Sequence, residues 1–290
     1  MAAKQVAKQL NEGRLLSSLL LPRGKANAHA SSGVSMYPNR IRSPTRPLMA
    51  FGRSYSTLYS PGSSRSDSIT GLLQQLEQSF PPALRQDGWY LTTAAALTSC
   101  GLQRHLGSLY LHLVSQPRYQ KPAQRQQLVR RIREALFKTI MICGIPRVMD
   151  GIASIARVER EEDQDHTIMR ANWQADEENR KRGEAALEAL FKDENTGIIE
   201  TFGSHREISW ISVNISYGCF LADYRILNAA ETELVVLPAI MCQNLSGPTS
   251  WHVRASQNVG IGREDVKKIQ LVTGMIAAFA GLDLDTVERL

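Results

Sequence analysis

One stretch of the sequence decides the fold, residues 228–281, which read NAAETELVVLPAIMCQNLSGPTSWHVRASQNVGIGREDVKKIQLVTGMIAAFAG. Asn228, with a glutamate three residues later, forms a capping-box pattern before an apolar run of helical length, so a first helix should begin at the next residue. Pro248 suits the first helical position of a second helix, which should end near Gly260. A third helix is expected after Gly262, with acidic residues in its first turn. The stretch therefore predicts an antiparallel three-helix unit.

The same stretch resembles the alkylhydroperoxidase D-like and carboxymuconolactone decarboxylase superfamily. These are all-α proteins in which a glutamate, an apolar helix, a helix-borne histidine and a final Ala-x-x-Gly follow one another. Glu233, His252 and residues 278–281 match that order. In the peroxidase branch two cysteines lie between the glutamate and the histidine, and Leu245 and Pro248 occupy their positions here. The resemblance keeps the proton-handling pair and lacks the Cys-x-x-Cys that disulfide-cycling peroxidases need.

An earlier segment repeats part of this resemblance. Residues 133–154 read REALFKTIMICGIPRVMDGIAS, and in the superfamily a helix likewise ends in Gly-x-Pro, with the next helix starting on that proline. The distance from a histidine to the closing glycine is also similar in the two places. We therefore expect two degenerate three-helix units, 88–157 and 207–290. The alternative is that short helices of similar length look alike by chance.

Apolar residues at helical spacing, ended by glycine or proline, predict helices elsewhere too. Residues 207–227 contain enough β-branched side chains for a strand, but an all-helical surround favours a helix. The chain shows no convincing hairpin dipeptides or alternating runs. The predicted fold class is therefore all-α, with the helical fold that the resemblance implies. Further helices are expected at 69–80, 89–100, 102–114, 122–142 and 176–192.

Two charged regions stand out, one inside the first expected helical unit and one between the two units. The first half of the helix 122–142 is rich in arginine, which we interpret as a solvated face, the alternative being an anion site. Residues 158–182 are densely charged with few apolar anchors, so we expect an exposed excursion from the body. The arginines in question are Arg125, Arg130, Arg131 and Arg133.

The basic charge of the chain is concentrated at its N-terminus. The formal net charge is +6, but residues 1–57 carry nine Lys and Arg against one acid, giving that segment +8 and the rest −2. Nucleic acid is therefore not implied as a partner. The leader resembles a mitochondrial presequence, with Arg53 two residues before a cut after Tyr55. We expect 1–57 to be a disordered presequence, 58–67 a linker and 68–290 the helical domain. A disordered basic tail is the alternative.

These features predict a location in the mitochondrial matrix. The tripeptide Glu288-Arg289-Leu290 resembles a degenerate peroxisomal targeting signal, so a peroxisomal location is the alternative. No apolar run is long enough to span a bilayer.

Cys100, Cys143, Cys219 and Cys242 are the four cysteines of the chain. They lie far apart in the sequence, without a Cys-x-x-Cys or a cluster of histidines. We expect buried, reduced thiols, with neither a disulfide framework nor a metal site.

Glu233 and His252 are the candidate catalytic residues. His252 should lie in the second turn of its helix, where the positive end of the helix dipole favours the neutral imidazole that a general base needs. The resemblance implies that Glu233 shares its pocket and orients the ring. The pair could then remove a proton next to a carbonyl without a metal or cofactor. The alternatives are a structural histidine and a surface glutamate in the first turn of a helix.

Other reactive side chains carry weaker signals. Cys242 could replace the missing nucleophile only if a kink at Pro238 turned it toward Glu233, because an unbroken helix directs the two side chains apart. His105 and His112 lie on one expected helix, but no third ligand is evident. Core packing or a wet cleft is therefore expected for the two histidines rather than a metal site.

Three functions of different classes follow. The resemblance to carboxymuconolactone decarboxylase implies cofactor-free acid–base chemistry on a small carboxylate or lactone, with His252 as base and Glu233 as its orienting partner. The peroxidase branch implies an antioxidant thiol peroxidase, which needs an essential cysteine. The third function is a non-catalytic helical module that forms trimers or hexamers, as superfamily members do. The sequence identifies neither the substrate nor the oligomer.

Overall fold

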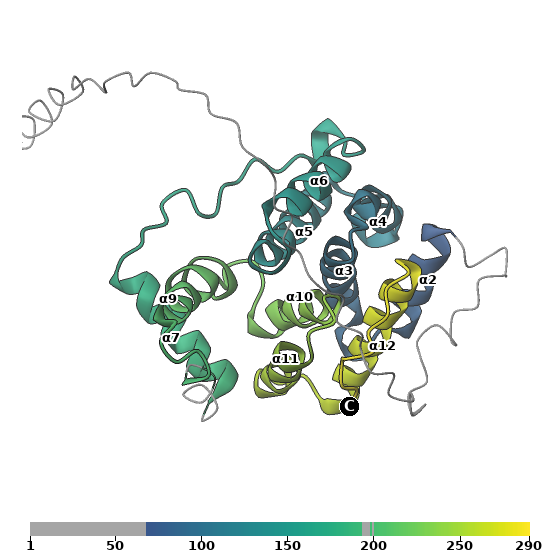
Figure 1. Cartoon of the computed structure of the whole chain (residues 1–290). Helices are drawn as coiled ribbons and strands as arrows, with labels where there is room; N and C mark the ends of the chain where they lie inside the picture. The colour runs from purple at the N-terminus through teal and green to yellow at the C-terminus, as the bar shows by residue number, and fades with distance from the viewer. Residues whose placement is uncertain (1–67, 193–197, 199) are drawn as a thin grey trace, which may run out of the picture. The chain divides into compact units, whose positions relative to one another are not determined.

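The computed structural model describes residues 68–192, 198 and 200–290. Every described residue belongs to the unit Phe51–Leu290. Over the described residues the chain forms helices and no strand, which confirms the all-α prediction (Figure 1). The expected leader, 1–57, and linker, 58–67, lie outside the described residues.

The helices follow one another with short connections. In chain order they are α2 (Ile69–Ser79), α3 (Pro82–Ser99), η2 (Gln103–His105), α4 (Leu106–Val114), η3 (Pro117–Tyr119), α5 (Pro122–Cys143), α6 (Ile145–Ala156), η4 (Glu161–Asp163), α7 (Glu177–Phe191), α9 (Arg206–Ile211), η5 (Ser212–Leu221), α10 (Ala229–Met241), α11 (Ser246–Asn258) and α12 (Arg263–Phe279). Of the η elements, η5 is a π-helix and the others are 3-10 turns.

Local signals decide where α10 and α12 begin. The Asn228 side chain accepts the Glu231 N–H and the Glu231 carboxylate accepts the Asn228 N–H, both at 2.9 Å, which is the expected capping box. α12 begins after Gly262, as predicted. α11 begins earlier than predicted, at Ser246, so Pro248 is its third residue rather than its first. The first turn tolerates a proline there, because its N–H groups have no partner within the helix.

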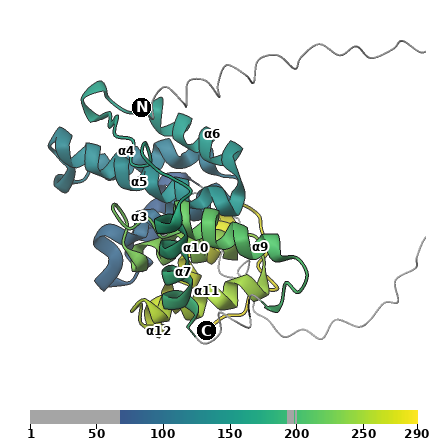
Figure 2. The same cartoon turned by 90° about the vertical axis from the view of Figure 1, so that its left-hand side faces the viewer.

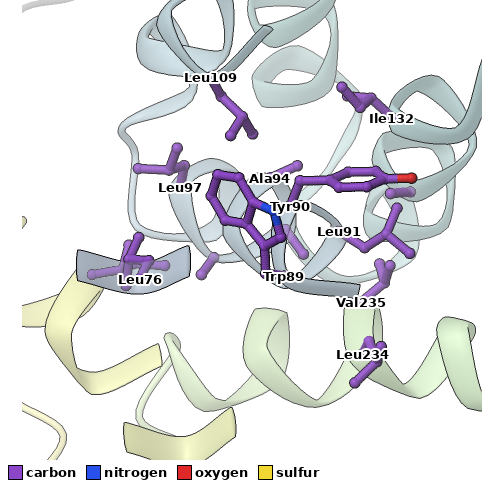
Figure 3. Close-up of a cluster of buried hydrophobic side chains, with 14 of the residues drawn as sticks. Leu76, Trp89, Tyr90, Leu91, Ala94, Leu97, Leu109, Ile132, Leu234 and Val235 are labelled. Carbon is purple, nitrogen blue, oxygen red and sulfur yellow. The ribbon is translucent and has the colours of Figure 1, made fainter. Parts of the chain in front are cut away.

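α3 is the central helix of the main apolar core. It begins at Pro82, earlier than the predicted start at residue 89, because proline suits the first turn of a helix. Every residue from Gly88 to Ser99 is buried. Figure 3 shows Trp89 and Tyr90 surrounded by side chains from α2, α4, α5 and α10. From Gly88 onward α3 is therefore covered on all its sides, whereas its first six residues are exposed or half-buried.

α10 lies between α3 and α11 in both views of the molecule (Figure 2). Thr92 Oγ1 donates to the Leu234 carbonyl oxygen at 2.8 Å, and farther along both helices Ser99 Oγ donates to the Ala239 carbonyl oxygen at 2.6 Å. The two helices therefore run in the same direction, and their buried hydroxyls are paired. α10 has one face in the main core and another face free to contact α11.

A second, smaller apolar cluster joins α7 and η5 to the α10–α11 pair. Its buried members are Ala186, Leu187, Leu190, Phe191, Tyr217, Leu221, Ala222, Val236 and Ala255. Gly183 and Gly218 allow the close approach of α7 and η5, since a Cβ on Gly183 would lie 2.0 Å from the Val213 carbonyl oxygen. Residues 207–221 are thus helical, as predicted, but they include a π-helix that the sequence did not indicate, and the predicted helix is wrong for residues 222–227, which form turns.

The arginine-rich half of α5 is not a solvated face, and this prediction is wrong. Arg125 is 4% exposed, and its Nε donates to Asp163 at 2.6 Å. Arg130 donates to Asp165 at 2.6 Å. These acids belong to residues 161–167, which we call the acidic strap and which lie within the predicted excursion 158–182. Opposite charges, rather than apolar anchors, hold the strap against α5.

Candidate functional site

Glu233 and His252 meet between α10 and α11. Nδ1 of His252 lies 3.0 Å from a carboxylate oxygen of Glu233. Both side chains are buried, Glu233 with 1% and His252 with 6% of its surface exposed. The structure therefore brings the two predicted site residues together. Glu233 lies in the second turn of α10 and in the core, not in the first turn at the surface.

A tight turn between α10 and α11 determines which residues of the two helices face each other. The four residues 242–245 link α10 to α11, and Asn244 adopts a left-handed backbone with φ of 55°. The turn is fixed from outside, because Thr286 Oγ1 donates to the Asn244 carbonyl oxygen at 2.6 Å. So short a connection makes the helices antiparallel neighbours, which places Glu233 opposite His252.

The hydrogen bond with Glu233 decides which nitrogen of His252 is available. A carboxylate only accepts hydrogen bonds, so Nδ1 carries the ring proton and donates a hydrogen bond to Glu233. In the neutral ring Nε2 is then an acceptor, and it has no hydrogen-bond partner among the described residues. The carboxylate also holds the ring in one orientation and one tautomer. The pair is therefore arranged as a general base.

Aromatic rings from α7 and η5 form the wall beside His252. The Phe191 ring meets the His252 ring edge-on, with centroids 5.6 Å apart, and meets the Tyr217 ring in the same way at 6.3 Å. Burial raises the pKa of Tyr217 well above its ordinary value, and the charge of Glu233 adds to the shift. Burial and Glu233 also raise the pKa of Tyr224. Sequence reasoning missed Phe191, Tyr217 and Tyr224, because nothing in the local pattern distinguishes them from core aromatics.

Thr249 lies one turn before His252 on the buried face of α11. It is 1% exposed, and its hydroxyl has no hydrogen-bond partner among the described residues. A buried hydroxyl without a partner carries a desolvation cost that a bound polar group or water would remove. Trp251, beside His252 in the sequence, is partly buried against the second apolar cluster.

The cavities measured on the described part of the chain lie away from the Glu233–His252 pair. One of about 460 Å³ is lined by Trp173 and Arg182, one of 350 Å³ by Tyr119 and Arg131, and one of 280 Å³ by residues including Phe137. Neither Glu233 nor His252 lines any of these three cavities. Every arginine that lines these cavities already donates to protein groups, namely Arg118, Arg130, Arg131, Arg133, Arg170, Arg182 and Arg225.

A buried lysine on α5 holds the end of η5. Nζ of Lys138, which is completely buried, lies 3.6 Å from the Glu134 carboxylate. Burial lowers the pKa of Lys138 to about 8, against the effect of Glu134. The sequence carried a weak signal for this contact, a glutamate and a lysine four residues apart in the apolar half of α5. The ammonium donates to the carbonyl oxygens of Phe220 (3.1 Å), Leu221 (2.8 Å) and Asp223 (3.1 Å).

Cys242 lies beside another cysteine rather than beside the Glu233–His252 pair. It is the C-cap residue of α10, and its neighbour Cys100 is the C-cap residue of α3. A hydrogen bond with the Cys100 thiol and burial raise the pKa of Cys242 well above its ordinary value. Such a thiol is a poor nucleophile, because the thiolate is the reactive form. All four cysteines are free, but only Cys242 is buried, so the expectation of buried thiols is wrong for the other three, which are half-buried. Cys100 and Cys242 also lie close together in space.

His105, in the 3-10 turn before α4, and His112, in α4, do not share a site. His112 Nε2 lies 3.1 Å from a Glu77 carboxylate oxygen, and its ring meets Trp89 edge-on at 5.6 Å. His105 instead meets Phe279 edge-on at 6.4 Å. Among the described residues, no group of three or more His, Cys, Asp or Glu side chains could hold a metal ion.

The chain is similar to two curated proteins named Peroxisomal protein 2. It is 22% identical to the one from Saccharomyces cerevisiae, over 72% of this chain and 94% of that protein. It is also 22% identical to the one from Schizosaccharomyces pombe, over 54% of this chain and 75% of that protein. No family model and no solved structure matches the chain. None of the described helices is long and apolar enough to cross a membrane.

These names overturn the expected mitochondrial location. Both relatives are named for the peroxisome, and neither name refers to the mitochondrion. The expectation depended on the composition of residues 1–57, which are basic and nearly free of acids. Composition of this kind is shared by many basic tails, so it does not by itself identify an organelle.

Proposed function

We propose that the chain performs acid–base chemistry on a small carboxylate or lactone at the Glu233–His252 pair. The observation that carries the proposal is the buried 3.0 Å hydrogen bond from His252 Nδ1 to Glu233, which leaves Nε2 free to accept a proton. The resemblance to carboxymuconolactone decarboxylase supports the same class of reaction, without a cofactor.

The chemistry follows from the protonation states. Nε2 of His252 takes a proton from the carbon next to a substrate carbonyl, and the electron pair moves onto the carbonyl oxygen to form an enolate. Glu233 stabilises the imidazolium that results, because opposite charges in a buried site interact strongly. Return of the proton to another carbon completes an isomerase cycle. In a decarboxylase cycle carbon dioxide leaves in place of the proton, its bonding electron pair forms the enolate, and protonated His252 delivers a proton to the carbon before taking a new one from water.

Peroxidase chemistry has less support. The two positions of the peroxidase cysteines hold Leu245 and Pro248. The remaining candidate, Cys242, has a thiol whose pKa is raised well above its usual value. We therefore rank the antioxidant function below acid–base chemistry.

Deuterium exchange tests the proposal without knowledge of the final product. The protein is incubated in D2O with γ-lactone acids and β-keto acids, and loss of the proton next to the carbonyl is followed by NMR. The wild type should exchange at least one of these acids. His252→Gln, which keeps a donor for Glu233 but has no base, should be slower by at least about 100-fold.

Cysteine variants provide the control. Cys242→Ala and Cys100→Ala should leave the exchange unchanged. Loss of activity in either variant, or peroxide consumption that depends on one cysteine, would favour the antioxidant function instead. Absence of exchange with every acid overturns the proposal and favours a non-catalytic module.

We also propose that the protein resides in peroxisomes. The support is that both relatives are named for the peroxisome. Fractionation of cells with an antibody against the untagged full-length chain tests this. The protein should sediment with peroxisomal marker proteins, and sedimentation with mitochondrial markers contradicts the proposal.

The superfamily resemblance further supports a homo-oligomer, which we propose as a trimer or hexamer. Large apolar side chains are exposed on α6 and α9, with Met149 at 65% and Trp210 at 60%. Exposed apolar groups of this size are common at protein interfaces. Light scattering of the purified protein should give a mass of three or six chains, and a monomer contradicts this proposal.

A further inference from the structure

We propose that the 280 Å³ cavity between α5 and residues 165–170 is a second ligand site, which binds a monocarboxylate with a short apolar tail. Arg130 holds the carboxylate, and apolar side chains of the cavity wall hold the tail. Neither Glu233 nor His252 lines this cavity, so the site is separate from that pair. The inference therefore goes beyond the proposed function and does not depend on it.

One face of α5 forms part of the cavity wall. Arg133, Glu134 and Phe137 follow Arg130 by three, four and seven residues, so the four side chains lie on the same side of the helix. Residues 165–170 and Ile226 supply the rest of the wall. Because these parts of the chain are distant in sequence, the cavity exists only in the folded protein.

Apolar side chains line a large part of the cavity. Phe137, Met169 and Ile226 are half-buried there, and Ile168 is 76% exposed. An aliphatic chain that lies against them leaves water without losing a hydrogen bond. At about 30 Å³ for a group of the size of water, the cavity has room for about nine non-hydrogen atoms, which is a carboxylate with a tail of about five carbons.

The charges in the wall favour an anion. Three arginines and two carboxylates line the cavity, which leaves one positive charge in excess while its histidine is neutral. Both carboxylates already have partners. Glu134 accepts both terminal nitrogens of Arg170, at 2.8 and 2.7 Å, and Asp165 accepts Nε of Arg130 at 2.6 Å. The unbalanced positive charge therefore attracts a further anion to the cavity.

Arg130 supplies the free donors. Only its Nε is used within the described part of the protein, where its two terminal nitrogens have no hydrogen-bond partner. The other two arginines of the wall differ, because both terminal nitrogens of Arg133 and of Arg170 donate to protein oxygens. The bond to Asp165 fixes the orientation of the Arg130 guanidinium, and its two remaining N–H edges match the two oxygens of a carboxylate.

Titration of the full-length protein with hexanoate, hexanol and acetate, followed by ligand-observed NMR, tests the chemistry of the site. Hexanoate should bind with a Kd on the order of 0.1–1 mM, as expected for so small a ligand. Hexanol has the tail without the charge, and acetate has the charge without the tail. Each should bind at least about 10-fold more weakly than hexanoate.

Two variants locate the bound hexanoate. Arg130→Gln removes the guanidinium, and Ile168→Glu adds a negative charge to the wall at a side chain exposed enough to be replaced without loss of the fold. Each should weaken hexanoate binding by at least about 10-fold. Arg118→Gln is the matched control for the first variant, because Arg118 is equally exposed and also binds an aspartate at 2.6 Å. Met149→Glu, at a 65% exposed position of α6, is the control for the second. Both controls should bind as the wild type does.

Weaker hexanoate binding in both variants, with unchanged binding in both controls, supports the site. Ile168→Glu keeps the test decisive if Arg130→Gln disturbs the acidic strap. Wild-type affinity in Ile168→Glu or in a folded Arg130→Gln overturns the proposal, as does equal affinity for hexanol, weaker binding in a control, or no binding at millimolar hexanoate. Weaker binding in His252→Gln would place hexanoate at the Glu233–His252 pair and also overturn it. None of these results decides the deuterium-exchange test, so the two proposals fail separately.

Discussion

A carboxylate as deeply buried as Glu233 is stable only while it keeps its partner. The bond with His252 is 3.0 Å long and lies in the core, so its loss leaves an unpaired buried charge. We expect His252→Ala to lower the free energy of unfolding by about 3 kcal/mol or more. The free energy of unfolding should fall much less in His252→Gln, because the glutamine amide can still donate a hydrogen bond to Glu233. Urea unfolding followed by circular dichroism measures both, and equal losses in the two variants would contradict this account.

Removal of the unpartnered hydroxyl of Thr249 should raise the free energy of unfolding rather than lower it. Thr249→Val keeps the shape of the side chain and removes a buried polar group that has no partner among the described residues, so stability should rise by about 1 kcal/mol. Thr232→Val is the matched control, because Thr232 is also buried with an unpartnered hydroxyl. Both variants should be more stable in urea. If the Thr249 hydroxyl serves a ligand, only Thr249→Val should also slow the exchange reaction.

Sequence reasoning identified two of the side chains at this site for a particular reason. The order of Glu233 and His252 along the chain matches the superfamily, and only that resemblance implied a shared pocket. The short turn between α10 and α11 is what brings the two side chains together. Phe191 and Tyr217 come from α7 and η5, whose contact depends on the glycine at position 183. No local pattern connects those segments to α11, so these residues could not be predicted.

At the scale of elements, the helices that were predicted well are those with local start signals. The capping box of α10 is complete within four residues, and α12 follows a glycine with acids in its first turn. The arginines of α5 were predicted wrongly because their partners are distant in the sequence. Arg125, Arg130 and Arg133 bind the acidic strap, more than thirty residues along the chain, and Arg131 binds Glu231. A helix face that pairs with distant acids has the same local composition as a face in water.

The acidic strap makes stability depend on pH. Burial opposes ionisation of Asp165, but hydrogen bonds from Thr167, Arg130 and Arg133 outweigh it and lower its pKa from 3.8 to about 2. The ionised form is favoured in the folded protein, so this contribution is complete above about pH 4 and is lost as pH falls toward 2. Asp165 thereby contributes about 2 kcal/mol to the free energy of unfolding at neutral pH.

The variant Asp165→Asn tests this dependence. The difference in unfolding free energy between the wild type and Asp165→Asn should be largest at pH 5 and shrink by about 2 kcal/mol near pH 2, as measured by urea titrations. Asp150→Asn is the matched control for the removal of one aspartate charge, since Asp150 binds Gln103 rather than an arginine. A difference that stays constant between pH 5 and pH 2 would show that the strap does not depend on Asp165.

At the scale of the whole molecule, the site lies where two apolar cores meet. The main core contains α3 and one face of α10, and the second cluster places α7 and η5 against α10 and α11. Two repeated three-helix units, 88–157 and 207–290, stay a prediction. The parallel contact of α3 with α10, and the two cysteines at their C-caps, fit such a repeat. The second cluster has no counterpart in that scheme, and it supplies the aromatic wall of the site.

The junction of the two cores can be loosened at one position. A Cβ on Gly183 would lie 2.0 Å from the Val213 carbonyl oxygen and 3.1 Å from the Gly218 nitrogen, so Gly183→Ala must move α7 away from η5. Overpacking of this kind costs on the order of 1–3 kcal/mol. Hydrogen exchange should become faster in α7 and η5 and stay unchanged in α3, and acylation of His252 by diethyl pyrocarbonate should become faster as its aromatic wall loosens. Gly247→Ala, whose Cβ meets nothing within 4 Å, should change none of these. If Gly183→Ala instead speeds exchange equally in α3 and η5, the two cores unfold as one unit, and the wall beside His252 is as stable as the rest of the molecule.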